Sequence, residues 1–172
     1  MAGPCVNILI KLDAPVTWRS FLAPFAIDWD GDDSCWIPVD KSASSNPESN
    51  RPFIGSVDRL GHEVSGCEYS AAKIDSIEQA ANRHFTHSIN LCAMCNRDVD
   101  HRLLCTTAGK IASSHDGIVD FDILDAPIEE LGMTKCEWVY DEPPYWKQCW
   151  TIIGDSRSCD CWLEHERFRM LK

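Results

Sequence analysis

Apolar and polar residues alternate along several short segments of the chain, a pattern typical of strands that are buried on one face. An apolar run at residues 6–12 ends at Asp13 and Pro15, and we expect a first strand there. Further strands are expected at residues 25–30, 36–39, 53–57, 103–107, 118–124, 136–140 and 148–153. The last two should form a hairpin, because the turn-forming sequence Asp-Glu-Pro-Pro-Tyr-Trp joins them.

The strongest helical pattern lies at residues 70–90, where no proline interrupts the chain. Its apolar residues recur at three- and four-residue spacing and so form one face: Ile74, Ile77, Ala80, Ala81, Phe85 and Ile89. A short helix is expected at residues 127–131, and Asp160 can cap a last helix that runs to about residue 171. Because strands and helices follow no strict βαβ rhythm, we predict an α+β fold, a mainly antiparallel sheet with one long central helix and a short C-terminal helix.

The clearest loop is the polar segment 41–52, which holds two prolines and no large apolar side chain. It is not a convincing domain boundary, because the roughly 40 residues before it are marginal as an independent fold. With 44% apolar residues the composition is globular. We therefore predict a single domain, 1–172, with a polar loop at 41–52.

The net charge is −11, which disfavours unaided binding to a phosphate backbone. Direct nucleic-acid binding is therefore not expected. Between residues 116 and 142, nine acidic residues stand against Lys135 alone. This stretch is either an ordinary solvated face or a surface that docks a basic partner.

The chain offers no segment of the ~18 apolar residues that a membrane span needs. The apolar run at 6–10 is shorter than the roughly 7–15 residues of a signal-peptide core. We therefore expect cytoplasmic synthesis and no membrane partner.

Ten cysteines are many for a protein made in a reducing cytosol. There, cysteines usually bind metal, take part in chemistry or pack as small hydrophobic residues. Their even number also allows disulfides, provided that the protein is oxidised after release from the cell. Cys35 and Cys67 have no partner nearby in the sequence and either pair with each other or pack.

One cysteine and histidine pattern has the spacing of a metal site, Cys92-x2-Cys95-x5-His101-x3-Cys105. A tetrahedral zinc ion takes four thiolate or imidazole ligands, and a Cys-x2-Cys turn can supply two of them. Over these 14 residues the spacing is similar to that of zinc-knuckle modules, shifted by one residue between the later ligands. The predicted metal ligands are therefore Cys92, Cys95, His101 and Cys105, and the predicted cofactor is a structural zinc. The alternative is that these cysteines simply pack in the core.

Two other ligand sets are open. A rival set combines His84 and His87 with Cys92 and Cys95, and it requires one unbroken helix through Cys95. A second cluster lies near the C-terminus at Cys149, Cys159, Cys161 and His165, with Cys136 close in sequence.

An enzyme hypothesis starts from His62-Glu63 followed by Cys92-x2-Cys95. These residues resemble the His-x-Glu and Pro-Cys-x2-Cys motifs of the zinc nucleoside deaminases, whose Glu shuttles protons beside a zinc-bound water. Here Glu63 follows His62 directly, and Leu91 stands at the proline position. The resemblance implies a zinc-dependent hydrolase or deaminase.

The sequence Asp28-x-Asp30-x-Asp32 resembles the start of a calcium loop. The sixth position holds Asp33 instead of glycine, and the twelfth holds Val39 instead of glutamate. We therefore expect an Asp-rich turn.

These patterns favour a non-enzymatic structural or interaction protein. The first hypothesis is a subunit of a large assembly such as a phage or virus particle, with other protein subunits as partners and incorporation into a virion. Cysteine cross-links, worth roughly 2–4 kcal/mol for a long loop, or a structural zinc would stabilise it. Its seven tryptophans suit buried contacts between subunits. The alternative is a zinc-stabilised acidic regulator or inhibitor that binds a basic partner, and the third hypothesis is the zinc-dependent hydrolase or deaminase.

Overall fold

A computed structural model describes residues 3–39, 50–61, 69–124, 126–142 and 145–170. The strands in these ranges are β1 Cys5–Ile10, β2 Asp28–Asp30, β3 Ser34–Pro38, β4 Asn50–Arg59, β5 His87–Ala93, β6 Ile118–Asp120, β7 Thr134–Glu142 and β8 Tyr145–Gly154. The helices are α1 Trp18–Leu22, α2 Ala71–Ala81, α3 Asp98–Ser114 and α4 Ser156–Glu164.

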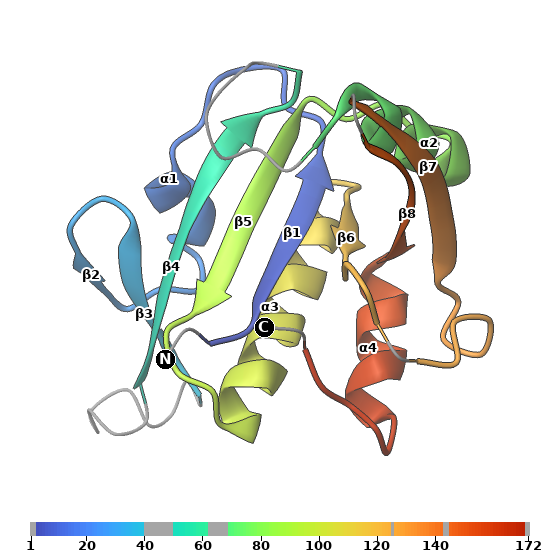
Figure 1. Cartoon of the computed structure of the whole chain (residues 1–172). Helices are drawn as coiled ribbons and strands as arrows, with labels where there is room; N and C mark the ends of the chain where they lie inside the picture. The colour runs from blue at the N-terminus through green and yellow to red at the C-terminus, as the bar shows by residue number, and fades with distance from the viewer. Residues whose placement is uncertain (1–2, 40–49, 62–68, 125, 143–144, 171–172) are drawn as a thin grey trace.

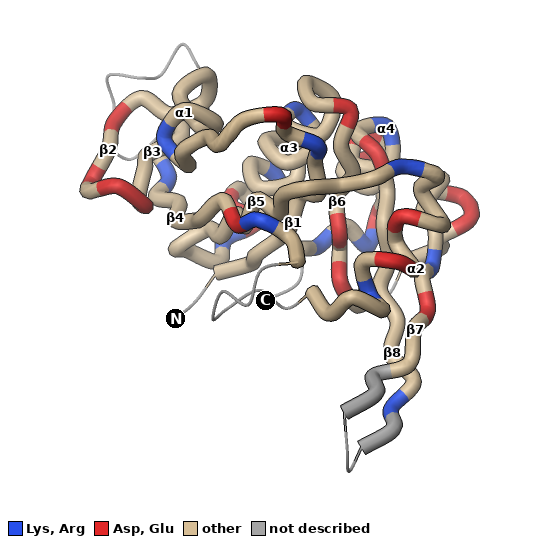
Figure 2. Tube along the Cα trace, turned by 90° about the horizontal axis from the view of Figure 1, so that it is seen from above, with Lys and Arg blue, Asp and Glu red and all other residues tan. Residues whose placement is uncertain are grey.

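The strands form one eight-stranded sheet in the order β2-β3-β4-β5-β1-β6-β8-β7. Each neighbouring pair is antiparallel. Figures 1 and 2 show α1, α3 and α4 on one side of this sheet and α2 on the other. We call the side under the three helices the covered face and the opposite side the second face.

The covered face carries the larger core, because strand side chains alternate between the two faces. Ile8 on β1 and its neighbours Ile89 and Leu91 on β5 are fully buried there, with Leu104 of α3 in the same cluster. A smaller core on the second face includes Ile77 of α2. The described residues therefore cover one side of the sheet fully and the other side in part.

The predicted helix at 70–90 is much shorter than expected. Ser70 caps α2 by accepting a hydrogen bond from the Lys73 amide, and the helix ends at Asn82, whose backbone is left-handed (φ 51°). Apolar spacing continues past this point because Phe85 packs in the same small core and the alternating residues of β5 follow at once. The helical spacing of apolar residues thus continues past the end of α2 into strand β5.

The longest helix among the described residues, α3, lies where the sequence predicted a strand at 103–107. It buries side chains at helical spacing: His101, Leu104, Cys105, Ala108, Ile111 and Ala112. Gly109 lets α4 approach closely, since a Cβ there would lie 3.0 Å from the Cβ of Cys159. Asp155, and not Asp160, caps α4, its side chain accepting from the Ser158 amide at 2.9 Å.

The α+β class and the mainly antiparallel sheet agree with the prediction, whereas one long central helix plus a short C-terminal helix is wrong: four helices are present in the described ranges. Residues 41–49 of the predicted polar loop lie outside those ranges, and residues 50–52 belong to β4. None of the described helices combines the length and hydropathy of a membrane-spanning segment.

Candidate functional site

The four predicted zinc ligands do not converge on one point. Cys92 lies on β5 and is disulfide-bonded to Cys5 of β1. Cys95 lies in the turn after β5, while His101 and Cys105 are buried on α3. Across the described ranges, no group of three or more His, Cys, Asp or Glu side chains is placed to hold a metal ion.

Both ring nitrogens of His101 have protein partners. Its Nδ1 accepts from the Met170 amide at 3.0 Å, so the proton sits on Nε2, which lies 2.9 Å from Oδ1 of Asn96 and donates to it. Burial lowers the pKa of His101, and the nearby Arg169 acts in the same direction. This side chain therefore ties the C-terminal segment to α3 as a neutral imidazole.

The rival ligand set is divided between two elements. His84 follows α2, and its Nδ1 lies 2.8 Å from Oε1 of Glu78. His87 begins β5, and its Nδ1 lies 2.8 Å from the hydroxyl of Thr86. The residues His62 and Glu63 of the enzyme hypothesis lie outside the described ranges.

The remaining cysteines of the sequence patterns are spread over several elements. Cys149 lies on β8, Cys159 and Cys161 lie on α4, and His165 follows α4. Cys159 is buried beside Cys105, and a hydrogen bond between the two side chains, together with burial, favours the protonated thiol and raises the pKa of Cys159 well above its usual value. Burial also raises the pKa of Cys35 to about 12. Cys35 is a free thiol, and Cys67, its proposed partner, lies outside the described residues.

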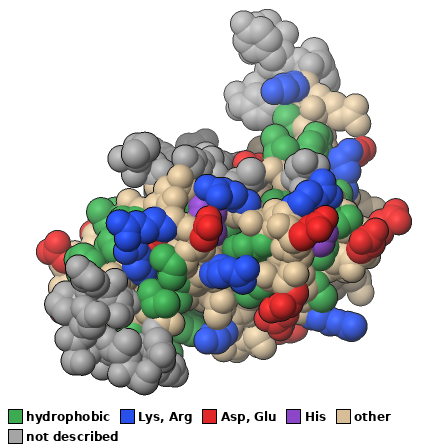
Figure 3. All heavy atoms as spheres, turned by 90° about the horizontal axis from the view of Figure 1, so that it is seen from below, with side chains coloured by type: hydrophobic (Ala, Val, Ile, Leu, Met, Phe, Trp, Pro, Cys, Tyr) green, Lys and Arg blue, Asp and Glu red, His purple; other side chains and the backbone are tan. Residues whose placement is uncertain are grey.

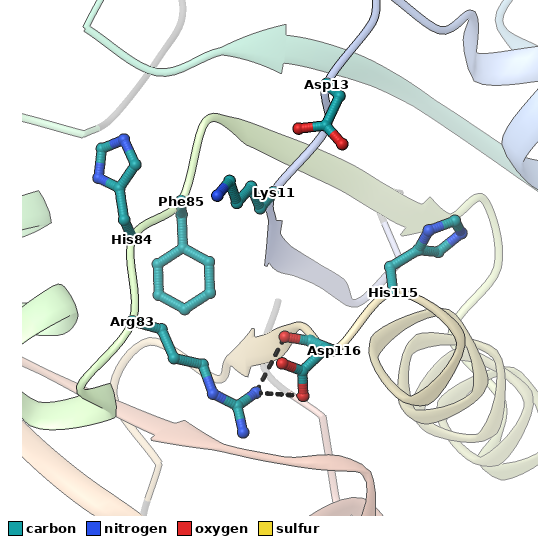
Figure 4. A pocket seen from close by; sticks show the side chains of 7 residues that line it. All are labelled: Lys11, Asp13, Arg83, His84, Phe85, His115 and Asp116. Atoms are coloured by element: carbon teal, nitrogen blue, oxygen red, sulfur yellow. Dashed lines mark hydrogen bonds and ion pairs between the residues drawn. The ribbon is translucent and has the colours of Figure 1, made fainter.

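A cavity of about 420 Å³ opens at one end of the sheet, between the C-terminal ends of α2 and α3 (Figure 4). Its described lining is Lys11, Asp13, Arg83, His84, Phe85, His115 and Asp116. Arg83 pairs with Asp116 at 2.8 Å. His84 and His115 lie on opposite sides of the cavity in Figure 4, and the described lining contains no Ser, Thr or Cys. The described lining residues therefore offer no hydroxyl or thiol nucleophile.

Under α2, a polar network is sealed inside the second face. Lys73 is buried, with its Nζ 3.0 Å from Oδ2 of Asp120 and 4.3 Å from the ring centre of Tyr69. The Tyr69 hydroxyl donates to the same Oδ2 at 2.6 Å, and Thr151 donates to Oδ1. The Asp122 amide also donates to Oδ1, at 2.9 Å. With four donors on one carboxylate, this network fulfils a structural role.

No sequence pattern indicates this network, because Asp120 belongs to the acidic stretch at 116–142. In the structure this stretch is not a continuous acidic surface. Asp116 is paired with Arg83, Asp120 is buried and Glu137 is paired with Lys135. Three of the nine acidic residues of this stretch are therefore engaged within the protein.

Far from α2, the second face carries an unusual group of exposed side chains. Asp28 on edge strand β2 lies opposite Trp36 of β3, and Ser34 lies opposite both Asp30 and Ile54. Directly opposed residues project from the same face of a sheet, so these side chains are neighbours. We call Asp28, Asp30, Trp36 and Ile54 the acidic–apolar patch.

Two large hydrophobic side chains of the patch are exposed to solvent. Trp36 and Ile54 are each 36% exposed, and the carboxylates of Asp28 and Asp30 are exposed beside them. No ion pair engages these two carboxylates within the described part of the chain. Figure 1 shows no helix in front of β3, β4, β5 and β1. We call this region the open half of the second face, and the region under α2 the sealed half.

Residues 2–172 match the model of a family of unknown function, DUF6368. The chain belongs to this family. Comparison with curated proteins and with solved structures gives no match. Membership in DUF6368 thus assigns no function, and the fold and its surfaces are the basis for a functional proposal.

Proposed function

We propose that this protein is a non-enzymatic binding domain that docks a basic protein partner on the acidic–apolar patch. The observation that carries the proposal is the exposure of Trp36 and Ile54 beside two exposed carboxylates that form no ion pair with any described residue. Aromatic and aliphatic anchors supply most of the affinity of a protein interface, while charges around them steer the partner and select it. The net charge of −11 favours approach of a positively charged surface.

The geometry also supports a particular mode of docking. Acidic side chains on an edge strand discourage another strand from pairing with it. Asp28 and Asp30 occupy the edge strand β2. We therefore expect the partner to lie across the face of the sheet, with its Lys and Arg residues near β2 and an apolar side chain against Trp36.

The proposal can be tested with two variants of matched composition. The patch variant is Asp28→Ser/Asp30→Ser/Ile54→Ser. The control variant, Glu129→Ser/Glu130→Ser/Ile123→Ser, removes the same charge and one exposed Ile from other parts of the surface. Proteins captured from the producing cell by wild type are purified, and their affinity for all three forms is measured at low and high salt.

We expect a basic partner that binds the patch variant at least about tenfold more weakly, that binds the control variant like wild type, and that is released by salt. Equal loss of binding in both variants, or equal retention in both, would contradict the proposal.

A second candidate, the assembly subunit, draws support from the β7–β8 hairpin. Figures 2 and 3 show this ribbon extending past the body of the molecule, and Val139 on β7 is 50% exposed. An isolated two-stranded ribbon is marginally stable in water, so contact with another subunit would stabilise it. Around its base, Figure 3 shows acidic, basic and hydrophobic side chains close together.

Native mass spectrometry over a range of protein concentrations tests this candidate and reports bound zinc in the same spectra. The assembly hypothesis expects oligomers that Val139→Lys disrupts and Val16→Lys, at another exposed valine, leaves intact. A monomer at every concentration would contradict self-assembly.

A further inference from the structure

The disulfide of the open half joins two strands that are already paired. Cys5 begins β1 and lies directly opposite Cys92 of β5, with their Cα atoms 4.1 Å apart and a sequence separation of 87. Hydrogen bonding continues along both strands up to Ile10 and His87. The sheet therefore holds the two sulfur atoms together whether or not they are bonded.

Both sulfurs are within reach of solvent. Cys5 and Cys92 are partly exposed, whereas Cys35, Cys105, Cys136 and Cys159 are buried. Burial raises the pKa of Cys136 to about 11, which keeps that thiol protonated and unreactive. A small thiol in solution can thus reach the bonded pair far more easily than the thiols of the core.

Each sulfur also has an oxygen beside it that could accept a hydrogen bond from a thiol. Oδ1 of Asn90 lies 3.2 Å from Sγ of Cys92, and the carbonyl oxygen of Gly3 lies 3.9 Å from Sγ of Cys5. The Asn90 amide is oriented by donating from Nδ2 to Oδ1 of Asn7 at 2.9 Å, which leaves its oxygen towards the sulfur. A disulfide has no hydrogen to donate to these oxygens, whereas a pair of thiols has two.

We propose that Cys5–Cys92 is a reversible thiol–disulfide site for small thiols of the glutathione type, and that Asn90 stabilises its reduced form. A thiolate attacks one sulfur of the pair, the protein S–S bond breaks, and the other cysteine leaves as a thiolate that takes a proton from water. A second thiolate attacks the mixed disulfide and releases the first cysteine. The protein disulfide and two small thiols become two protein thiols and one small disulfide.

The experiment uses the full chain with Cys95→Ser, Cys149→Ser and Cys161→Ser, because these are the partly or fully exposed free thiols in the described ranges. The protein is equilibrated in buffers of reduced and oxidised glutathione at varied ratios, starting from either form. Thiols are then trapped with N-ethylmaleimide, and the peptides with Cys5, Cys92 and Cys67 are quantified separately by mass spectrometry.

We expect Cys5 and Cys92 to be labelled together, along one curve reached from both directions, with an unchanged circular dichroism spectrum. The proposal is overturned if the bond resists glutathione until denaturant is added. It is equally overturned if both thiols remain labelled in oxidised glutathione.

A matched pair of variants tests the part played by Asn90. Asn90→Ala removes the acceptor from Cys92, and Asn7→Ala breaks the same amide pair while leaving that acceptor in place. We expect Asn90→Ala to change the glutathione ratio at which half of the protein is reduced about threefold, in favour of the disulfide. Asn7→Ala should change this ratio less. Equal midpoints in the two variants would refute the stabilising role of Asn90.

Discussion

The two halves of the second face treat polar groups in opposite ways. In the sealed half, α2 encloses Lys73 and Asp120, and four donors from the protein itself contact that carboxylate. In the open half, Asn90 and Cys92 are partly exposed, and Trp36 stands in solvent beside two carboxylates. The polar groups of the sealed half thus stabilise the fold, whereas those of the open half face solvent.

This difference separates residues that hold the fold from residues that are free for function. A buried charge is stable only while its partner and hydrogen bonds are in place, so the sealed half tolerates little change. An exposed polar or apolar side chain contributes little to folding and can change with little effect on stability. We expect stability to depend on the sealed half and binding to depend on the open half.

The largest effect is expected from Asp120→Ala. This change leaves the Lys73 ammonium buried without a counter-charge and removes the acceptor of Tyr69 and Thr151, which should lower the free energy of unfolding by about 3–5 kcal/mol. Lys73→Met should cost less, because Asp120 keeps its other donors. Urea denaturation measures both, and a smaller loss for Asp120→Ala than for Lys73→Met would contradict the network.

A neighbouring pair on β5 sharpens the contrast between buried and open positions. Ile89 is fully buried in the core of the covered face, so Ile89→Ala should cost about 2–5 kcal/mol. Asn90→Ala, one residue along and on the open half, should cost no more than about 1.5 kcal/mol for its hydrogen bond to Asn7. Chemical denaturation measures the free energy of unfolding of the two variants. Similar losses of stability would contradict the assignment of Asn90 to the open half.

His101 predicts a pH dependence that arises on the covered side. Its pKa in the folded protein is below the ordinary 6.5, so the unfolded chain binds the proton more readily. Stability should be fully present above about pH 6.5 and fall as the pH drops below it, by at most about 1.4 kcal/mol per pH unit for this one group. His87, whose pKa is also lowered by burial, acts with the same sign.

The check is the free energy of unfolding from pH 7.5 to 5.5 in wild type and in His101→Gln. The variant should show a flatter profile, and His101→Gln/His87→Gln the flattest. A wild-type profile as flat as that of the double variant would contradict the dependence of stability on the protonation of these histidines.

The smallest effect is expected from Asp28→Ser/Asp30→Ser. These carboxylates are exposed and make no ion pair among the described residues, so stability should stay within about 0.5 kcal/mol of wild type. Thermal unfolding of wild type and the double variant at low and high salt measures this difference in stability. A loss well beyond this range would give the patch a structural role.

Local patterns predicted much of the sheet, located α2 and α4 only in part, and missed α1 and α3. The first strand and the last hairpin were found because their alternation is regular and turn residues bound them. The end of α2 was missed because Asn82, and not glycine or proline, takes the left-handed position. In α3, the spacing of His101 and Cys105 suggests metal ligands but fits the buried side of a helix equally well.

The candidate sites depended on contacts that no local pattern reports. Cys92 could not be matched with Cys5 because their pairing follows from the placement of β1 beside β5, 87 residues apart. The same applies to Asp120 of β6, which pairs with Lys73 because α2, from a distant part of the sequence, packs against β7 on this side of the sheet. The acidic–apolar patch was partly visible as an Asp-rich turn, but its apolar members come from β3 and β4.

Hydroxyl-radical footprinting of the free protein and of its complex with the captured basic partner tests the central claim most directly. We predict that oxidation of Trp36 decreases strongly in the complex, while oxidation of Trp150, partly exposed on β8, is unchanged. If Trp36 is oxidised equally in both samples and protection appears at Trp150 instead, the open half is not the binding surface.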